Sequence, residues 1–334
     1  MPHVVAAPDK FRGTATAAEV AAAVGRAATA AGWTCDEAPV ADGGEGILDA
    51  LGGTVRRSRA HGPLGEAVTA EWRTEGTTAV IEVAQVAGLD LVGGSEWNDP
   101  MRASTAGVAD LITAAVAAGA NRIVVGVGGS ATTDGGLGCV RALDSRRLRG
   151  VELVVACDVS TTFVDAAREF APQKGATPSQ VALLTRRLER LAQLYQEEHG
   201  VDVADLPGSG AAGGLAGGLA ALGASLVPGF ELVADSIDLA HRIENADLTV
   251  TGEGFLDEHS FEGKAVGGVV ELCREAGVPV LAVVGEVFAD ERVPTVSLVE
   301  RHGRDRAFTE TLACVEEAVA EHLSGFDHQQ RDDQ

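Results

Sequence analysis

The chain has 334 residues, of which 46% are hydrophobic and 22% are charged. These proportions are those of a folded globular protein, so they exclude a disordered or coiled-coil chain. The 49 acidic and 26 basic residues give a net charge of -23, which disfavours nucleic acid and anionic membranes as partners. An anionic substrate would therefore need local basic residues, backbone N–H groups or divalent cations at its site.

The cysteines and the N-terminal residues indicate in which cellular compartment the protein is found. The five cysteines are far apart and form no CxxC pair, which argues against a zinc site or a disulfide framework and favours reduced thiols. The start MPHVVAAPDKF lacks the pattern of a signal peptide, and no apolar run approaches the roughly 18 residues of a membrane span. We therefore expect a cytoplasmic protein without a membrane segment.

Apolar runs, helical periodicity and turn residues predict the elements in chain order. They are a strand at 4–7, a helix at 17–31, a strand at 33–40, a hairpin over 67–83, a helix at 105–118, strands at 122–127 and 151–157, a helix at 179–199, a strand at 247–251, a helix at 264–276, and strands at 278–284 and 295–298. Thr16 and Glu19 predict a capping box at the first helix. Glu75 and Gly76 separate the two alternating runs of the hairpin, which predicts an antiparallel pair.

This alternation of strands and helices predicts an α/β fold with a doubly wound, Rossmann-like parallel sheet. The first two strands and the last three would form one sheet, in a discontinuous domain of residues 1–60 and 241–325. Residues 61–240 would then be an inserted α/β domain with a mixed sheet, because the hairpin breaks the parallel rhythm. We expect the polar residues 326–334 to be a flexible tail.

Polar, glycine-rich loops follow the predicted strands at four places. They are PDKFRG at 8–13, ADGGEG at 41–46, GVGGSATTDGG at 126–136 and TGEGFLDEHSFEGK at 251–264. Ligands of open α/β sheets bind at the carboxyl ends of strands, and glycines let backbone N–H groups approach phosphate oxygens. The loops therefore predict an anion-binding site.

Carboxylates and basic residues accompany these loops. The carboxylates are Asp9, Asp42, Glu45, Asp134, Asp158, Glu253 and Asp257, and the basic residues are Lys10, Arg12, Lys174 and Lys264. Mg²⁺ prefers oxygen ligands, and a further carboxylate can accept a hydroxyl proton during phosphoryl transfer. The set fits a Mg·ATP-dependent kinase, although each residue alone fits a turn or a cap equally well.

Two nucleotide-binding motifs fail or are weak. A Walker A loop ending at Gly263 and Lys264 would need glycine at position 258 and Ser or Thr at 265, but the chain has Glu258 and Ala265. A degenerate dinucleotide fingerprint occurs at residues 126–131 and again at 208–213, so an NAD(P)-dependent oxidoreductase of a small hydroxy acid stays open as an alternative. The segment 208–218 fits close packing against backbone as well as a ligand loop.

Taken in order, the loops resemble those of the glycerate kinase family. The matching segments are APDKFRGTATAAEV, PVADGGEG, EVAQVAGL, VGVGGSATTDGG, VACDV, APQKGATP, LPGSGAAGGLAGGL, LGASLVPG, ADLTVTGEGFLD and GKAVGGV, which run from residue 6 to about 285. The resemblance implies ATP-dependent phosphorylation of D-glycerate with Mg²⁺, on two α/β domains whose cleft holds the active site. A homodimer is left open as the assembly.

Several of these polar residues match motif positions of the family, and we infer a role for each from its chemistry. Asp158 or Asp134 would orient and deprotonate the substrate hydroxyl, and Asp42 is the third catalytic candidate. Substrate and phosphate binding would involve Asp9, Lys10, Arg12, Gly128, Gly129, Ser130, Thr132, Lys174 and Lys264, and Glu253 and Asp257 would lie near Mg²⁺.

The chain departs from the family pattern beside two of these loops. Residues 160–170 read STTFVDAAREF, where many relatives have an Asn-Pro and a glycine-containing stretch, and Phe255 occupies a position where a basic residue is common. An altered substrate or a catalytically lapsed nucleotide-binding protein is therefore a further alternative. Whether the 2- or the 3-hydroxyl of glycerate is phosphorylated depends on placement that a sequence does not reveal.

Overall fold

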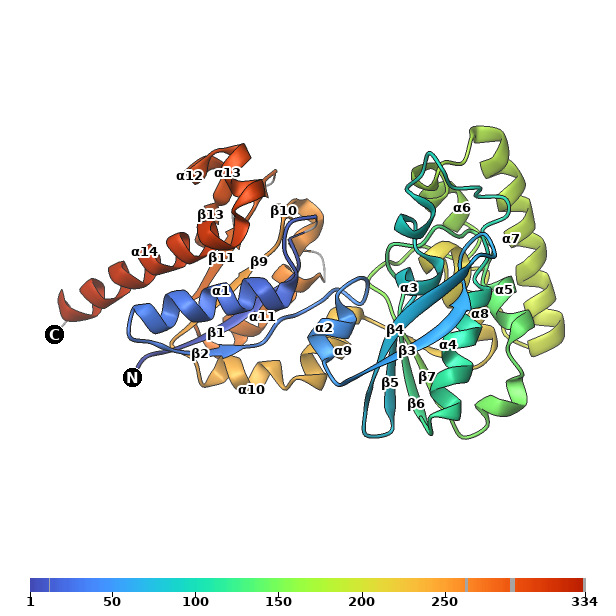
Figure 1. The fold of residues 1–334 in the computed structure, drawn as a ribbon, viewed down its shortest axis with the longest axis horizontal. Coiled ribbons are helices and arrows are strands. Elements are labelled where there is room, and N and C mark those ends of the chain that lie inside the picture. The colour runs from blue at the N-terminus through green and yellow to red at the C-terminus, as the bar shows by residue number, and fades with distance from the viewer. Residues whose placement is uncertain (12, 262–263, 289–291, 333–334) are drawn as a thin grey trace. The chain divides into compact units, whose positions relative to one another are not determined.

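The chain forms two compact units in a computed structural model that describes residues 1–11, 13–261, 264–288 and 292–332 (Figure 1). The first unit consists of Met1–Asp42 and Phe230–Gln334, and the second of Gly43–Gly229. The second unit is therefore inserted into the first. In the described part of the chain, no helix is long and apolar enough to span a membrane.

The first unit is built on a parallel sheet in the order β13-β11-β9-β1-β2. Its strands are β1 (His3–Pro8), β2 (Thr34–Glu37), β9 (Leu248–Gly252), β11 (Val280–Val284) and β13 (Thr295–Ser297). The prediction that the first two and last three strands share one sheet is confirmed. A small parallel pair, β10 (Phe255–Leu256) and β12 (Glu286–Val287), was not predicted, because two-residue strands carry no periodicity.

Helices cover both faces of this sheet. They are α1 (Ala17–Ala30), α9 (Gly229–Ser236), α10 (Leu239–Glu244), η4 (Glu258–Phe261), α11 (Ala265–Ala276), α12 (Leu298–His302), α13 (Arg304–Thr309) and α14 (Thr311–Asp332). Val4 and Ala6 pack with α1 and α14, whereas Val5 and Ala7 pack with α10 and α11. Side chains alternate across a strand, so the run VVAA is apolar throughout because both faces are buried. The capping box at the start of α1 is confirmed.

The second unit contains a mixed sheet in the order β3-β4-β5-β6-β7-β8. Its strands are β3 (Thr54–His61), β4 (Ala67–Glu75), β5 (Thr78–Glu82), β6 (Arg122–Gly126), β7 (Glu152–Ala156) and β8 (Ser225–Val227). β3, β4 and β5 are antiparallel, and β5 to β8 are parallel. The predicted hairpin and the mixed sheet are confirmed.

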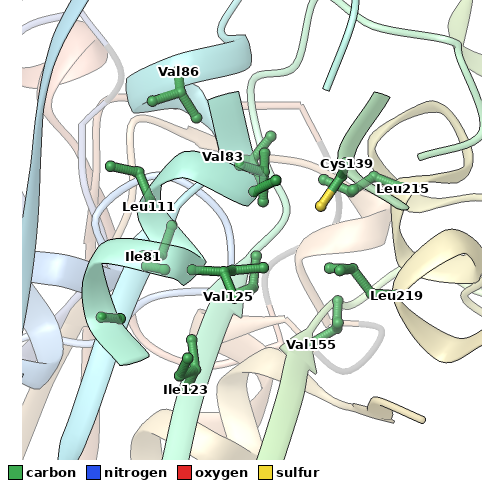
Figure 2. Packing of buried hydrophobic residues seen from close by; sticks show 14 of the residues in the cluster. Ile81, Val83, Val86, Leu111, Ile123, Val125, Cys139, Val155, Leu215 and Leu219 are labelled. Carbon is green, nitrogen blue, oxygen red and sulfur yellow. The ribbon is translucent and has the colours of Figure 1, made fainter. Parts of the chain in front are cut away.

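The helices of the second unit are α2 (Ile47–Leu51), α3 (Ala84–Ala87), η1 (Asp90–Val92), α4 (Ala106–Ala117), α5 (Leu137–Ala142), η2 (Ser145–Leu148), α6 (Ala166–Phe170), η3 (Pro172–Lys174), α7 (Pro178–His199) and α8 (Ala211–Ala221). Of these, α3, α4, α5 and α8 supply buried side chains to the core on one face of the sheet. Figure 2 shows Ile81, Ile123 and Val155 of three neighbouring strands beneath Leu111 of α4 and Leu215 of α8. This core fixes the strand ends from which the polar loops leave.

The observed boundaries differ from the expected ones. The units divide at 42/43 and 229/230, whereas we expected 60/61 and 240/241. The polar β3 joins the second sheet by pairing with β4, and its largely exposed residues gave no apolar signal. Near the C-terminus, α14 extends through Asp332, so the expected tail of residues 326–334 begins within a helix.

Candidate active site

In the first unit, two polar loops leave adjacent strands. β1 and β9 pair in parallel with Pro8 opposite Gly252, so Asp9 and Glu253 follow neighbouring strand ends. The backbone N–H of Asp9 donates to the carbonyl of Gly252 at 2.8 Å. This register brings two of the predicted site carboxylates together, as expected for the carboxyl edge of a parallel sheet.

Asp9 and Lys10 form the centre of this cluster. Asp9 is 6% exposed, and its Oδ1 accepts from the backbone N–H of Lys10 at 2.7 Å. The Lys10 Nζ lies 3.6 Å from Asp9 Oδ1 and 3.6 Å from Asp42 Oδ1. Burial raises the pKa of Asp9 to about 6, although the positive charge of Lys10 opposes the shift. Arg12 lies outside the described residues.

Glu253 is the second buried carboxyl of the cluster. Burial raises its pKa to about 7, while a hydrogen bond from the Ser260 side chain and the charge of Lys264 oppose the shift. Its Oε1 is buried and has no hydrogen-bond partner in the described chain. An unsatisfied buried oxygen is costly, so this atom is placed to accept from a ligand or to bind a cation.

Asp257 has a more structural setting. Its Oδ1 accepts from the backbone N–H and the hydroxyl of Ser260 at 3.0 and 3.2 Å, which caps the turn η4. No group of three or more His, Cys, Asp or Glu that could hold a metal occurs among the described residues. Mg²⁺ usually takes only one or two carboxylates together with phosphate and water. Glu253 and its neighbours therefore fit a cation that arrives with a nucleotide.

In the second unit, two glycine-rich loops lie in backbone contact. The backbone N–H of Val127 donates to the Gly43 carbonyl at 3.1 Å. A Cβ at Gly128 would lie 2.7 Å from the Gly44 Cα, and one at Gly129, where φ is +61°, would lie 2.3 Å from Glu45 Oε1. Glycine is thus needed at Gly128 for packing against backbone and favoured at Gly129 by its positive φ, whether or not their N–H groups also bind phosphate.

The same region holds Asp158, at the end of β7, and Glu82, at the end of β5. Asp158 is half-buried, and its Oδ1 accepts from the backbone N–H of Gly229 at 2.6 Å. Glu82 Oε1 accepts from the N–H groups of Gly46 and Leu48 at 2.7 and 3.2 Å, which caps the short helix α2. Sequence reasoning missed Glu82, although its position directly after an apolar strand was a usable signal.

Lys174 lies buried beneath the loop 126–136. It is 4% exposed, and its Nζ donates to Ser130 Oγ at 2.8 Å and to the Thr132 carbonyl at 2.7 Å. Burial lowers its pKa to about 7, against the opposing charge of Asp134. The ammonium is therefore committed to the loop itself, and its expected contact with an anionic substrate stays a prediction.

Asp134 is satisfied by its surroundings. Its Oδ2 accepts from the N–H and hydroxyl of Thr105, both at 2.9 Å, and from the N–H of Gly138 at 3.1 Å, while Oδ1 accepts from Gly136 N–H at 3.1 Å. Desolvation raises its pKa, and the backbone N–H of Thr105 is the strongest opposing influence. This carboxylate joins the loop to the start of α4 and α5, which fits a role in holding the loop.

Two further residues hold this loop and were missed. Asn98 Nδ2 donates to the carbonyls of Ala131 and Lys174 at 2.9 and 2.8 Å. Tyr195 Oη donates to the Gly135 carbonyl at 2.9 Å. Tyr195 is the only tyrosine of the chain and lies on the apolar side of a predicted helix, which was a weak signal. Nothing in the sequence around Asn98 indicated its contacts.

The segment 208–218 acts as a packing surface. Ala212, Gly213 and Gly214 have φ of 51°, 68° and 90° at the start of α8. A Cβ at Gly213 would lie 2.0 Å from the Thr132 carbonyl oxygen, and one at Gly214 would lie 2.8 Å from the Gly135 Cα. Of the two interpretations left open by the sequence, the structure favours close backbone packing over a ligand loop.

The predicted site residues therefore fall into two clusters, one in each unit. Around the strand ends of the first unit lie Asp9, Lys10, Asp42, Glu253, Asp257 and Lys264. Around the loop 126–136 of the second unit lie Gly128, Gly129, Ser130, Thr132, Asp134, Asp158 and Lys174. The roles assigned to these residues stay predictions.

Comparison with known proteins gives the chemical setting of these clusters. The chain matches the family described as "Glycerate kinase family" over residues 4–148 and 144–322. It is 35% identical to the glycerate 2-kinase of Escherichia coli (strain K12), covering 92% of this chain and 90% of that protein. It is 37% identical to the glycerate kinase of Halalkalibacterium halodurans, with the same coverage of both chains.

A solved structure agrees with these relatives. The crystal structure of putative glycerate kinase 2 from Salmonella typhimurium LT2 superposes with a TM-score of 0.83 at 30% identity, and covers 99% of both chains. The predicted α/β fold and the family resemblance are confirmed. The alternatives of an NAD(P)-dependent oxidoreductase and of a lapsed binding protein find no support among these relatives.

Proposed function

Since the chain belongs to the glycerate kinase family and transfers a phosphoryl group from ATP to glycerate, we propose that its product is 2-phosphoglycerate. The support for this regiochemistry is the likeness to the Escherichia coli protein named glycerate 2-kinase, which extends over 92% of this chain. The acceptor is then the secondary hydroxyl beside the carboxylate of glycerate.

Asp158 is the proposed general base. Phosphoryl transfer is catalysed mostly by positioning and charge stabilisation, with a carboxylate that orients the attacking hydroxyl. Asp158 ends a parallel strand, and the Gly229 N–H fixes its Oδ1. Asp134, the other candidate, has four hydrogen bonds within its own loop. The single observation that carries this choice is that Asp134 is committed to the fold.

The loop 126–132 is the proposed phosphate cradle. We propose that backbone N–H groups of its glycines contact phosphate oxygens, while Lys174 holds the loop through Ser130 and the Thr132 carbonyl. Lys174 is thus proposed as a positioning residue. Lys10 and Lys264, which lie beside the carboxylates of the first unit, are proposed to balance the charge of bound phosphate.

Glu253 is the proposed Mg²⁺ ligand, with Asp257 beside it. Its buried, unpaired Oε1 fits an oxygen ligand for a divalent cation. When bound, Mg²⁺ would neutralise charge on the phosphates of ATP. Asp9 and Lys10 would keep the surrounding loops in place through their contacts at the end of β1.

A cytoplasmic location and a homodimer are also proposed. The use of ATP as donor and the five unpaired cysteines fit a reducing compartment. Fractionation would test the location, and light scattering would test the dimer.

The central experiment is an ADP-release assay with Mg·ATP and D-glycerate, with the phosphate position read by NMR. We expect turnover with phosphate on the 2-hydroxyl. Phosphate on the 3-hydroxyl would overturn the proposed regiochemistry while leaving the kinase intact.

The role of Asp158 is tested in the same assay. Asp158→Asn should lower kcat by about 10²- to 10⁴-fold, as for loss of a general base, while ATP affinity stays within about threefold. Asp205→Asn, at an exposed aspartate of the same unit, is the matched control. Near-normal turnover of Asp158→Asn would remove it from the proposed mechanism.

A further inference from the structure

The second unit contains a cavity beside α7 and α5. Its volume is about 680 Å³, which lies within the range of about 300–1,000 Å³ for small-molecule sites. The wall is largely apolar, with Met101, Leu137, Leu184, Leu188, Leu191 and Leu194 among the lining residues. An apolar wall of this size gives a poor match to glycerate, which carries hydroxyl groups and a carboxylate but no apolar chain.

Five arginines also line this cavity. They are Arg102, Arg141, Arg186, Arg187 and Arg190, five of the 26 basic residues of a chain whose net charge is -23. They come from three separate segments, namely the loop before α4, the helix α5 and the helix α7. In a strongly acidic protein, such a concentration marks a local attraction for anions.

Few of these arginines have partners of opposite charge. Arg187 donates to the Met101 carbonyl at 3.1 Å, and Arg190 donates to Gln193 Oε1 at 2.9 Å and lies 3.8 Å from Glu197. For the guanidinium groups of Arg102, Arg141 and Arg186 the described residues provide no hydrogen bond or ion pair. The one carboxylate in the lining, Asp134, is already bound by four donors of its own surroundings.

Packing alone accounts for only part of this arrangement. Arginine stems often cover apolar surface while the charged ends stay in water. That use does not explain why Arg186 and Arg190, one helical turn apart, place like charges on the same side of α7. Thr133, which is 1% exposed and also lines the cavity, has a hydroxyl with no hydrogen-bond partner in the described chain. An unsatisfied donor is thus available to a ligand oxygen.

We propose that this cavity binds a small anion with an apolar chain, such as a medium-chain alkyl carboxylate or alkyl phosphate. The leucines would bury the chain, and the arginines would pair with the anionic group, for which the guanidinium geometry is well suited. The cavity would therefore be a ligand site separate from the transfer of phosphate to glycerate.

Titration calorimetry of the full chain without nucleotide tests this proposal. Hexanoate, octanoate and octyl phosphate are the probes, with 1-octanol, inorganic phosphate and D-glycerate as comparisons. We expect one site, an affinity that rises by up to about fourfold for each added CH₂ group, and much weaker binding of the three comparison compounds.

Variants separate the two parts of the site. The double variant Arg102→Gln/Arg186→Gln should weaken octanoate binding at least tenfold, whereas Arg149→Gln, at an exposed arginine outside the cavity, should not. Leu183→Ser, at an exposed lining residue, should reduce the gain in affinity per CH₂ group. All three should keep their turnover of glycerate, which shows that they are folded.

Several results would overturn the proposal. These are the absence of saturable octanoate binding, equal binding of 1-octanol, or an equal loss in Arg149→Gln. Competition by D-glycerate that depends on Arg102 and Arg186 would instead identify the cavity as the substrate site. Because binding is measured without ATP, failure here is distinct from failure of the proposed regiochemistry or base.

Discussion

The polar clusters of the two units are built from similar residues but are satisfied to different degrees. In the first unit, Glu253 keeps a buried oxygen without a partner, and burial raises the pKa of both Asp9 and Glu253. In the second unit, Asp134 has four donors and Lys174 has two acceptors, all within the protein. The difference shows that a charged side chain in a loop can have either of two roles. It can be available to bind a ligand, or it can stabilise the loop itself.

The largest effect should come from breaking the satisfied carboxylate. Asp134→Asn replaces an acceptor with a donor that faces Thr105 and the backbone N–H groups, and we expect a loss of about 4 kcal/mol in unfolding free energy. Urea unfolding would measure it. Asp202→Asn, at an exposed residue that accepts one backbone N–H, should change stability by less than about 0.5 kcal/mol. If Asp134→Asn also changed the unfolding free energy by less than about 0.5 kcal/mol, the hydrogen bonds of Asp134 would not stabilise the second unit as we infer.

A backbone contact of the second unit gives the next effect. Gly213→Ala would place a methyl group 2.0 Å from the Thr132 carbonyl oxygen at a φ of +68°, so we expect a loss of about 3 kcal/mol. Gly223→Ala is the matched control, since its φ is +95° but no atom lies within 4 Å of the added Cβ. It should cost about 1 kcal/mol. Equal melting temperatures for the two variants would show that the contact with Thr132 is unimportant.

In the first unit the corresponding change should affect function and leave the fold intact. Glu253→Gln should lower kcat/KM for Mg·ATP by about 100-fold, equivalent to about 2.7 kcal/mol, and weaken Mn²⁺ binding measured by electron paramagnetic resonance. Its unfolding free energy should not fall, because the carboxyl has an oxygen without a partner in the described chain. Glu258→Gln, at an exposed neighbour, is the control. Destabilisation without any change in Mn²⁺ affinity would assign Glu253 to the fold.

The smallest effect, counted per pH unit, concerns the buried amine of the second unit. The pKa of Lys174 is about 7 in the folded chain and ordinarily 10.5, so between these values the unfolded state binds more protons. The free energy of unfolding should therefore rise with pH between about pH 7 and 10.5, by at most about 1.4 kcal/mol per pH unit relative to Lys174→Met. Below pH 7 the two proteins should show the same pH dependence. Urea unfolding in a Trp33→Phe background, where the tryptophans left are Trp72 and Trp97 of the second unit, measures it.

The control for this pH dependence is Lys264→Met. Lys264 lies in the first unit, so its replacement should leave the pH dependence of the second unit's unfolding unchanged. A wild-type slope that persists in Lys174→Met would assign the pH dependence to other groups.

Much of the fold could be predicted because strands buried on both faces form continuous apolar runs. Residues 4–7, 122–127 and 278–284 were found in this way, and each contains a strand that pairs in parallel with its neighbours. β3 was missed because its residues are polar and largely exposed, and its place depends on pairing with β4. For the same reason the first boundary between the units was expected at 60/61, whereas it lies at 42/43.

The candidate site could be predicted only as a set of loops. The sequence placed Asp9, Asp158 and Glu253 after strands, and the parallel sheets put their loops at strand ends. The sequence did not reveal that the buried Lys174 donates to Ser130, or that Thr105 and Asn98 form hydrogen bonds that stabilise the same region. These contacts join residues that are 29 to 76 positions apart in the chain.

By itself the sequence determined the fold class, the glycerate kinase family and the loops that carry the polar residues, because periodicity and local motifs are properties of short segments. The tertiary structure decided which charges are satisfied and which are open to a ligand. It also decided that Arg102, Arg141 and the arginines of α7 surround one apolar cavity. The physical reason is that desolvation and hydrogen bonding depend on neighbours from distant parts of the chain.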